Sequence, residues 1–311
     1  MTHPLHYCWV TEANGLGPAY RTWLGLPDGL PLPFYGDHGV CYLGRLDTSE
    51  LSSRPRIHTT WGRSREAQLR RDPGGKTIVR IPCPWVMYRR MLGIERQPDA
   101  RGTLIFMPHS LPNTELELAL EDYVGRVVGD PRFPAPHTLV VHPHDMAKGL
   151  GERLEASGWN VHCFGSAREP AFIANFYATA SRHTHAVSCR PGSELHYCHE
   201  LGLVYRQVDG TIEERSLDER IATTRALQAQ DALTARLLDR QHLLFHADGT
   251  ASDRERDAFV ADTLSLDLAT DAVRRDFRAL VLERLLPEAM PWLFEVGGRV
   301  ASRLRTGLQT P

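Results

Sequence analysis

The sequence predicts an α/β protein made of two doubly wound domains followed by a helical C-terminal region. Short apolar runs alternate with segments of helical spacing up to about residue 208, a pattern typical of βαβ units and parallel sheets. A polar stretch that contains Pro98, at residues 93–102, interrupts this alternation once. Beyond residue 211 only helical spacing is found. We therefore expect three units, at residues 1–98, 99–210 and 211–311.

In the first unit, β-branched and aromatic runs predict strands and apolar residues three or four apart predict helices. The expected strands are residues 5–10, 32–40, 56–61 and 76–82, and the expected helices are residues 17–24, 64–71 and 85–92. Pro82 and Pro84 close the last of these strands, because proline has no N–H to donate to a neighbouring strand.

The second unit repeats the alternation. The expected strands are residues 103–107, 138–141, 160–164, 185–189 and 203–208, and the expected helices are residues 114–128, 146–157, 171–180 and 194–201. Parallel strands joined through helices require crossover connections, which are right-handed in nearly all proteins.

The C-terminal region contains four helical patterns, at residues 217–244, 254–264, 271–286 and 292–304. The last has an apolar face opposite Arg299 and Arg303. Two interpretations stay open for it: a helix packed on both domains, and a helix that rests on an anionic membrane surface.

Composition excludes several classes of protein. The 311 residues carry a formal net charge of -2, with 42% hydrophobic and 24% charged residues. The chain is thus neither disordered nor a dedicated nucleic-acid binder. It has no apolar stretch long enough to span a membrane. Residues 1–20 lack the pattern of a secretory leader, so we expect none,. Its six cysteines stand singly. We expect a cytoplasmic protein, with the last helix as its candidate contact with the inner face of the membrane.

Four polar clusters follow expected strands, and they are the candidate functional residues. They are Asp37-His38, His109-Ser110, His142-Pro143-His144-Asp145 and Gly192-Ser193-Glu194. Ligands of open parallel sheets bind at the carboxyl ends of the strands. We therefore expect these clusters to face one cleft.

Gly192, Ser193 and Glu194 stand between a strand and a helix. The free N–H groups and positive end of a helix suit a phosphate, although Ser193 can equally serve as an ordinary helix cap. His142 can donate a hydrogen bond to a phosphate. It can also bond local backbone, or share a metal with His144 and Asp145.

The other two clusters suit complementary roles. His109 and Ser110 can contact a substrate phosphate or cap the next helix. Asp37 or His38, across the cleft, can act as a general base, or Asp37 can stabilise a turn beside its glycines. Walker, dinucleotide-binding and Ser-elbow motifs are absent,.

His142-Pro143, followed 51 positions later (193 minus 142) by the serine of Gly192-Ser193, resembles the HP and serine motifs of bacterial GT-B glycosyltransferases. That clan includes sialyltransferases, capsule Kdo transferases and, more distantly, polyol-phosphate transferases. The resemblance covers about residues 30–208. It implies a GT-B-like fold with two Rossmann-like domains facing a cleft. It also implies that His142 and Ser193 hold the donor phosphate and that Asp37 matches an acidic base; His38 occupies the second acidic position of that motif, so either residue can be the base.

The expected function is transfer of a sugar from a nucleotide-activated donor, such as a CMP-sugar, to a hydroxyl of a glycan or lipid-linked glycan in surface polysaccharide synthesis. Donor-binding residues would be His109, Ser110, His142, Gly192, Ser193 and Glu194. No acidic metal motif is found, so we expect transfer without a metal or cofactor. We also expect inversion at the sugar carbon, because the reaction would be a single displacement. The alternatives are a nucleotide-sugar epimerase or hydrolase, a metal-dependent hydrolase built on His142, His144 and Asp145, and a catalytically silent sugar-binding or assembly subunit.

Overall fold

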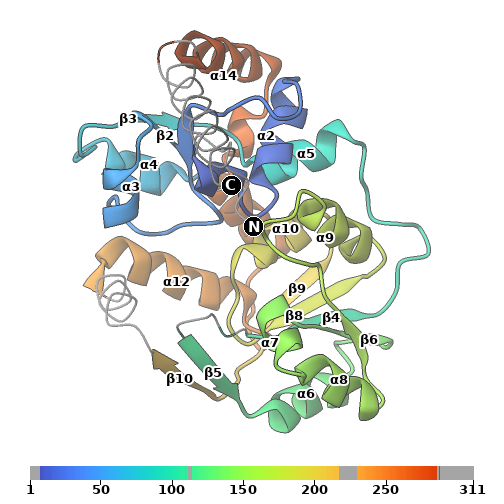
Figure 1. Ribbon diagram of the computed structural model, residues 1–311. Coiled ribbons are helices and arrows are strands. Elements are labelled where there is room, and N and C mark those ends of the chain that lie inside the picture. The colour runs from blue at the N-terminus through green and yellow to red at the C-terminus, as the bar shows by residue number, and fades with distance from the viewer. Residues whose placement is uncertain (1–7, 109, 111–113, 217–229, 286, 288–311) are drawn as a thin grey trace, which may run out of the picture.

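The computed structural model describes residues 8–108, 110, 114–216, 230–285 and 287. Its described part is an α/β fold with two parallel sheets and one antiparallel ribbon (Figure 1). The first sheet has the strand order β1-β2-β3, and the second has the order β7-β6-β4-β8-β9. The predicted α/β class with parallel sheets is therefore confirmed.

The first sheet consists of β1 (Phe34–Gly36), β2 (Ile57–Thr60) and β3 (Thr77–Arg80). The connections between them hold α3 (Thr48–Ser52) and α4 (Arg63–Leu69), and the sheet is flanked by α2 (Leu16–Leu24) and α5 (Pro84–Met91) (Figure 1). Proline at the first position of α5 favours a helix start there,. Each new strand is added on the same side of the one before it. Within the described chain, this sheet therefore lacks the reversal of strand order that defines a doubly wound sheet.

The second sheet has that reversal. The chain enters at the central strand β4 (Thr103–Phe106), moves outward to β6 (His137–Val140) and β7 (Asn160–His162), and returns to β8 (His185–Ser188) and β9 (Val204–Gln207). Every neighbouring pair is parallel. The carboxyl ends of β4, β6 and β8 therefore lie at one edge, where such folds bind ligands.

Helices cover both faces of the second sheet. They are α6 (Leu120–Gly129), α7 (Pro143–Ala147), α8 (Leu150–Ala156), α9 (Phe172–Ala180) and α10 (Ser193–Glu200). The single helix expected at residues 146–157 is divided between α7 and α8, with Gly149 in the left-handed region at φ +78° between them.

One apolar cluster joins the two sheets. The Trp85 ring of α5 stacks on Tyr197 of α10, with ring centroids 4.6 Å apart, and it meets Phe176 of α9 edge-on. Beside this contact, the Arg89 guanidinium donates to both oxygens of Glu200 at 2.7 and 2.8 Å. The expected domain limits at residues 98 and 210 stay predictions.

Three local expectations are wrong. The described end of the expected strand 5–10 belongs to a helix, α1 (Trp9–Glu12). The expected helix 114–128 begins as a strand, β5 (Thr114–Leu118), paired antiparallel with β10 (Ile212–Ser216), so the region after residue 211 is not purely helical. Leu116, Leu120 and Val124 are four residues apart, which is the spacing of a helix. The strand β5 was missed because its partner, β10, lies far along the chain.

The C-terminal region returns to both sheets. It contains α12 (Ala232–Phe245), α13 (Asp253–Thr263), the 3₁₀ turn Leu266–Leu268 and α14 (Asp271–Arg284). On the first sheet, Phe277 of α14 stacks on Trp23 of α2 at 5.8 Å. The expected helix 292–304 lies outside the described residues. Among the described helices, none combines the length and hydrophobicity that crossing a bilayer requires.

Candidate functional site

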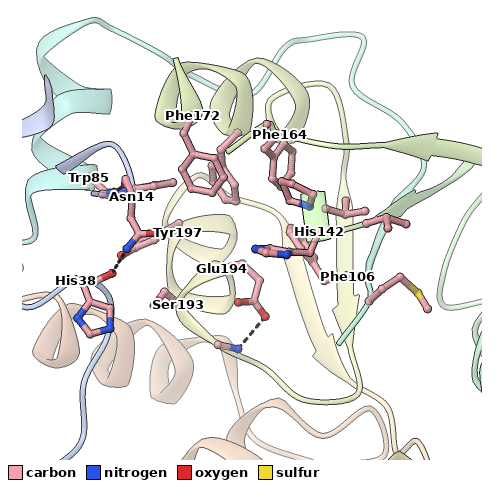
Figure 2. Close-up of a pocket in the computed structure, with 17 residues that line it drawn as sticks. Asn14, His38, Trp85, Phe106, His142, Phe164, Phe172, Ser193, Glu194 and Tyr197 are labelled. Carbon is pink, nitrogen blue, oxygen red and sulfur yellow. Dashed lines mark hydrogen bonds between the residues drawn. The ribbon is translucent and has the colours of Figure 1, made fainter. Parts of the chain in front are cut away.

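A cavity of about 380 Å³ opens at the carboxyl edge of the second sheet and faces the first sheet (Figure 2). We call it the main cavity. Polar groups from several of the predicted clusters line it together. These are His38 from the loop after β1, His142 from the loop after β6, and Gly192, Ser193 and Glu194 from the start of α10.

His142 is fixed by the way that β6 ends. It is the N-cap of α7, and its Nδ1 accepts a hydrogen bond from the His144 N–H at 3.2 Å. Because Nδ1 is the acceptor, a neutral His142 carries its hydrogen on Nε2 and is a donor there. Figure 2 shows the His142 ring and the Glu194 carboxylate turned toward the same space.

Three hydrogen bonds hold the start of α10. The Ser193 Oγ accepts a hydrogen bond from the Val40 N–H at 2.8 Å. The Glu194 Oε1 accepts from the Gly192 N–H at 2.8 Å and from the Tyr205 hydroxyl at 2.9 Å. The Ser193 hydroxyl also interacts with the Tyr197 hydroxyl, and Glu194 places a carboxylate at the helix start.

Asp37 directly follows β1 and is 3% exposed. Arg65 donates to both of its oxygens at 3.0 Å, Thr60 donates to it at 2.6 Å, and the His58 Nε2 lies 3.0 Å away. Burial alone would raise the pKa of Asp37, but Arg65 and His58 outweigh burial and hold it well below its usual range. The carboxylate is thus occupied by partners within the first sheet.

His38, in contrast, is exposed. Its carbonyl oxygen accepts from the Asn14 side-chain amide at 3.3 Å, and the residue lines the main cavity. Of the two candidates for a general base, His38 is the exposed one and the one that lines the main cavity.

A second cavity of about 350 Å³ adjoins the first, and both His38 and Ser193 line the two cavities. We call it the second cavity. Asp37, Asp47 and Glu50 contribute to one of its walls, and Thr234 and Leu238 of α12 contribute to another.

Ser110, the described residue of the cluster after β4, is not among the residues that line the main cavity. Ser110 is buried, and its N–H donates to the Asp145 carboxylate at 3.1 Å, so these residues tie together the loops after β4 and β6. Met107 lines the main cavity from this loop. His109 lies outside the described residues.

Sequence reasoning missed the apolar wall of the main cavity. This wall contains Trp85, Phe106, Phe164, Phe172, Phe176 and Tyr197. The sequence signal was weak because aromatic residues at helical spacing usually mark core. Asn14, another lining residue, was missed too. It has φ +55°, and its backbone carbonyl oxygen accepts a hydrogen bond from the Trp85 indole N–H at 2.9 Å.

Among the described residues, the group that brings three metal-ligating atoms within 4.8 Å of one another is Asp37, Glu50 and His58. His142, His144 and Asp145 do not form such a group. The Arg65 guanidinium already donates to Asp37 and to Glu50, the latter at 2.7 Å. With a fixed cation at their centre, these residues suit an ion-pair network better than a metal centre.

The chain matches no protein-family model, no curated protein and no solved structure.

Proposed function

We propose that the protein is a GT-B-type glycosyltransferase that moves a sugar from a nucleotide-activated donor to a hydroxyl of a glycan in surface polysaccharide synthesis. The observation that carries this proposal is the composition of the main cavity. There, His142 and the start of α10 adjoin His38 at the carboxyl edge of a doubly wound sheet.

In the proposed reaction, the acceptor oxygen forms a bond to the anomeric carbon while the bond from that carbon to the donor phosphate breaks. The electron pair of the broken bond stays on the phosphate oxygen. The Nε2–H of His142, the Ser193 hydroxyl and the positive end of α10 stabilise that charge, an effect of about 3–4 kcal/mol per well-placed donor. One displacement inverts the configuration, and we expect no metal or cofactor to take part.

The acceptor proton goes to His38 in this proposal. Asp37 keeps a positioning part, because its contacts with Arg65 and Thr60 anchor the loop that presents His38. The second cavity reaches His38 from the other side, and we assign the acceptor hydroxyl to it.

The apolar wall offers the donor a surface for its base or sugar ring, since aromatic side chains stack on both. Trp85 and Phe172 contribute to this wall. Glu194 is suited to accept hydrogen bonds from ribose hydroxyls, as acidic residues at this edge of a doubly wound sheet do.

The decisive experiment combines a nucleotide screen with an assay of donor turnover. Purified protein is heated with CMP, CDP, UDP or GDP, because a bound nucleotide raises the melting temperature through mass action. We expect one nucleotide to stabilise the wild type and the His38→Ala variant alike, and His142→Ala to lose most of that shift. Turnover of the matching nucleotide-sugar should fall about 100-fold or more in His38→Ala.

His242→Gln, on the exposed side of α12, is the control and should behave as the wild type. Unchanged turnover in both His38→Ala and His142→Ala would exclude this mechanism. Turnover without any acceptor would favour the epimerase or hydrolase, and binding without turnover would favour the silent sugar-binding subunit. Stoichiometric metal in active protein would favour the metal-dependent hydrolase.

Residues 292–304 keep their two interpretations, because they lie outside the described chain. Deleting residues 291–311 and measuring sedimentation with anionic vesicles tests the membrane contact. Sedimentation that survives the deletion would remove this segment as the membrane contact.

A further inference from the structure

A hollow of about 450 Å³ lies between the end of α2 and the first turns of α14. We call it the arginine hollow. Leu24 and Gly25 form the side that belongs to α2, and the other side consists of Asp271, Arg274, Arg275 and Arg278 of α14. Among the described residues, those that line it differ from those that line the main cavity and the second cavity.

The three arginines converge because of helix geometry. Arg274 and Arg278 are four positions apart, and such residues lie one above the other on a helix face. Gly25 ends α2 in the left-handed region at φ +61°, and a Cβ at this position would lie 3.4 Å from the Arg274 Nη2. The Arg274 guanidinium thus lies directly against the glycine.

The guanidinium groups of Arg274, Arg275 and Arg278 make no ion pair or side-chain hydrogen bond within the part of the chain that the structure describes. Asp271, the carboxylate that lines the hollow, is not paired with any of them there. Other arginines are paired closely, as Arg21 is with Glu12 and Arg89 with Glu200. Three positive charges and one negative charge leave the hollow with a net charge of +2, on a chain whose net charge is -2.

We propose that the arginine hollow binds a phosphate-bearing ligand. Each guanidinium presents a planar fork of N–H donors that matches phosphate oxygens, and a phosphate offers enough acceptors to engage more than one arginine. The bound anion also relieves the mutual repulsion of the three cations. The phosphate belongs either to a soluble anion or to the headgroup of an anionic lipid, and both present the same chemistry.

Two probes separate these sources. Inorganic pyrophosphate, titrated calorimetrically, represents the soluble anion, and vesicles of phosphatidylglycerol in phosphatidylcholine, used in co-sedimentation, represent the membrane surface. The test variant is Arg275→Gln with Arg278→Gln, both exposed. The matched control is Arg236→Gln with Arg254→Gln, which removes two exposed charges elsewhere. Both variants should keep the wild-type melting temperature.

We expect the wild type and the control to bind at least one probe, and the test variant to bind it about tenfold more weakly or worse. Binding should weaken as salt is added, because screening acts on exposed charges. Pyrophosphate binding alone identifies a soluble ligand, and vesicle binding alone identifies a headgroup. The proposal is overturned if the wild type binds neither probe, if the test variant binds as the wild type does, or if the control loses as much as the test variant. Pyrophosphate that binds only in the main cavity would bind the test variant as tightly as the wild type. A failure of this proposal can therefore be told apart from a failure of the proposed function.

Discussion

The backbone N–H of Val40 donates to the Ser193 hydroxyl at 2.8 Å, across 153 positions of sequence. This bond connects the loop after β1 to the start of α10. Ser193 lines both cavities, as does His38. The position of the proposed base relative to the proposed phosphate site therefore depends on contacts between the two sheets.

The first prediction concerns Gly39, which lies against this bond. A Cβ on residue 39 would stand 2.6 Å from the Ser193 Oγ, so Gly39→Ala must displace the serine or the loop. We expect a loss of about 1–3 kcal/mol in the free energy of unfolding, as for other overpacked sites, measured by urea denaturation.

Gly125→Ala is its control, because nothing lies within 4 Å of a Cβ there and α6 is exposed at this residue. This variant should gain about 0.5–1 kcal/mol. Equal stability of the two variants would contradict the close packing at Gly39.

The second prediction concerns Arg65, which is 1% exposed and bonds both Asp37 and Glu50. Arg65→Met leaves two buried carboxylates without their cation, which costs about 3–5 kcal/mol. Arg126→Ala removes an exposed i,i+4 pair with Asp122 and should cost less than about 1 kcal/mol. Denaturation curves of the two variants measure the difference, and similar costs would show that the buried cluster does not stabilise the fold.

The third prediction concerns His196, whose Nε2 lies 3.0 Å from the Tyr42 hydroxyl. Burial lowers the pKa of His196 to about 3, below its value in an unfolded chain. The unfolded chain therefore binds the proton first, and stability is lost as pH falls from about 6.5 toward 3. One such group contributes a slope of about 1.4 kcal/mol per pH unit in this range.

Substituting His196→Gln keeps a polar partner for Tyr42 and removes the titration. Unfolding free energies between pH 4 and 6 should then fall less steeply than in the wild type by about this slope. His242→Gln, on an exposed part of α12, should follow the wild-type curve. An unchanged slope in His196→Gln would refute the buried neutral state.

The fourth prediction concerns Trp85, which belongs to the apolar wall and stacks on Tyr197. If a nucleotide binds there, it should quench the fluorescence of Trp85. Trp85→Phe should remove that quenching, and Trp159→Phe, a tryptophan outside the lining of the main cavity, should keep it. Quenching that survives in Trp85→Phe would place the nucleotide elsewhere.

Local sequence was enough to predict most strands and helices of the second sheet. Those elements follow from periodicity, and the parallel arrangement follows from their alternation. The same rule predicted that His142, Gly192, Ser193 and Glu194 would meet, because parallel strands end at one edge. The structure places all four in the main cavity.

Only the tertiary structure determined which partners Asp37 and Ser110 bind. Both stand at strand ends as expected, yet Asp37 is held by Arg65, 28 positions away, and Ser110 by Asp145, 35 positions away. Whether a polar side chain faces a ligand or a buried partner depends on which distant residue reaches it. The same reason explains why β5 pairs with β10 and why α14 packs on the first sheet. The periodicity of a segment shows which of its faces is buried. The partner of that face is determined by packing across the whole chain.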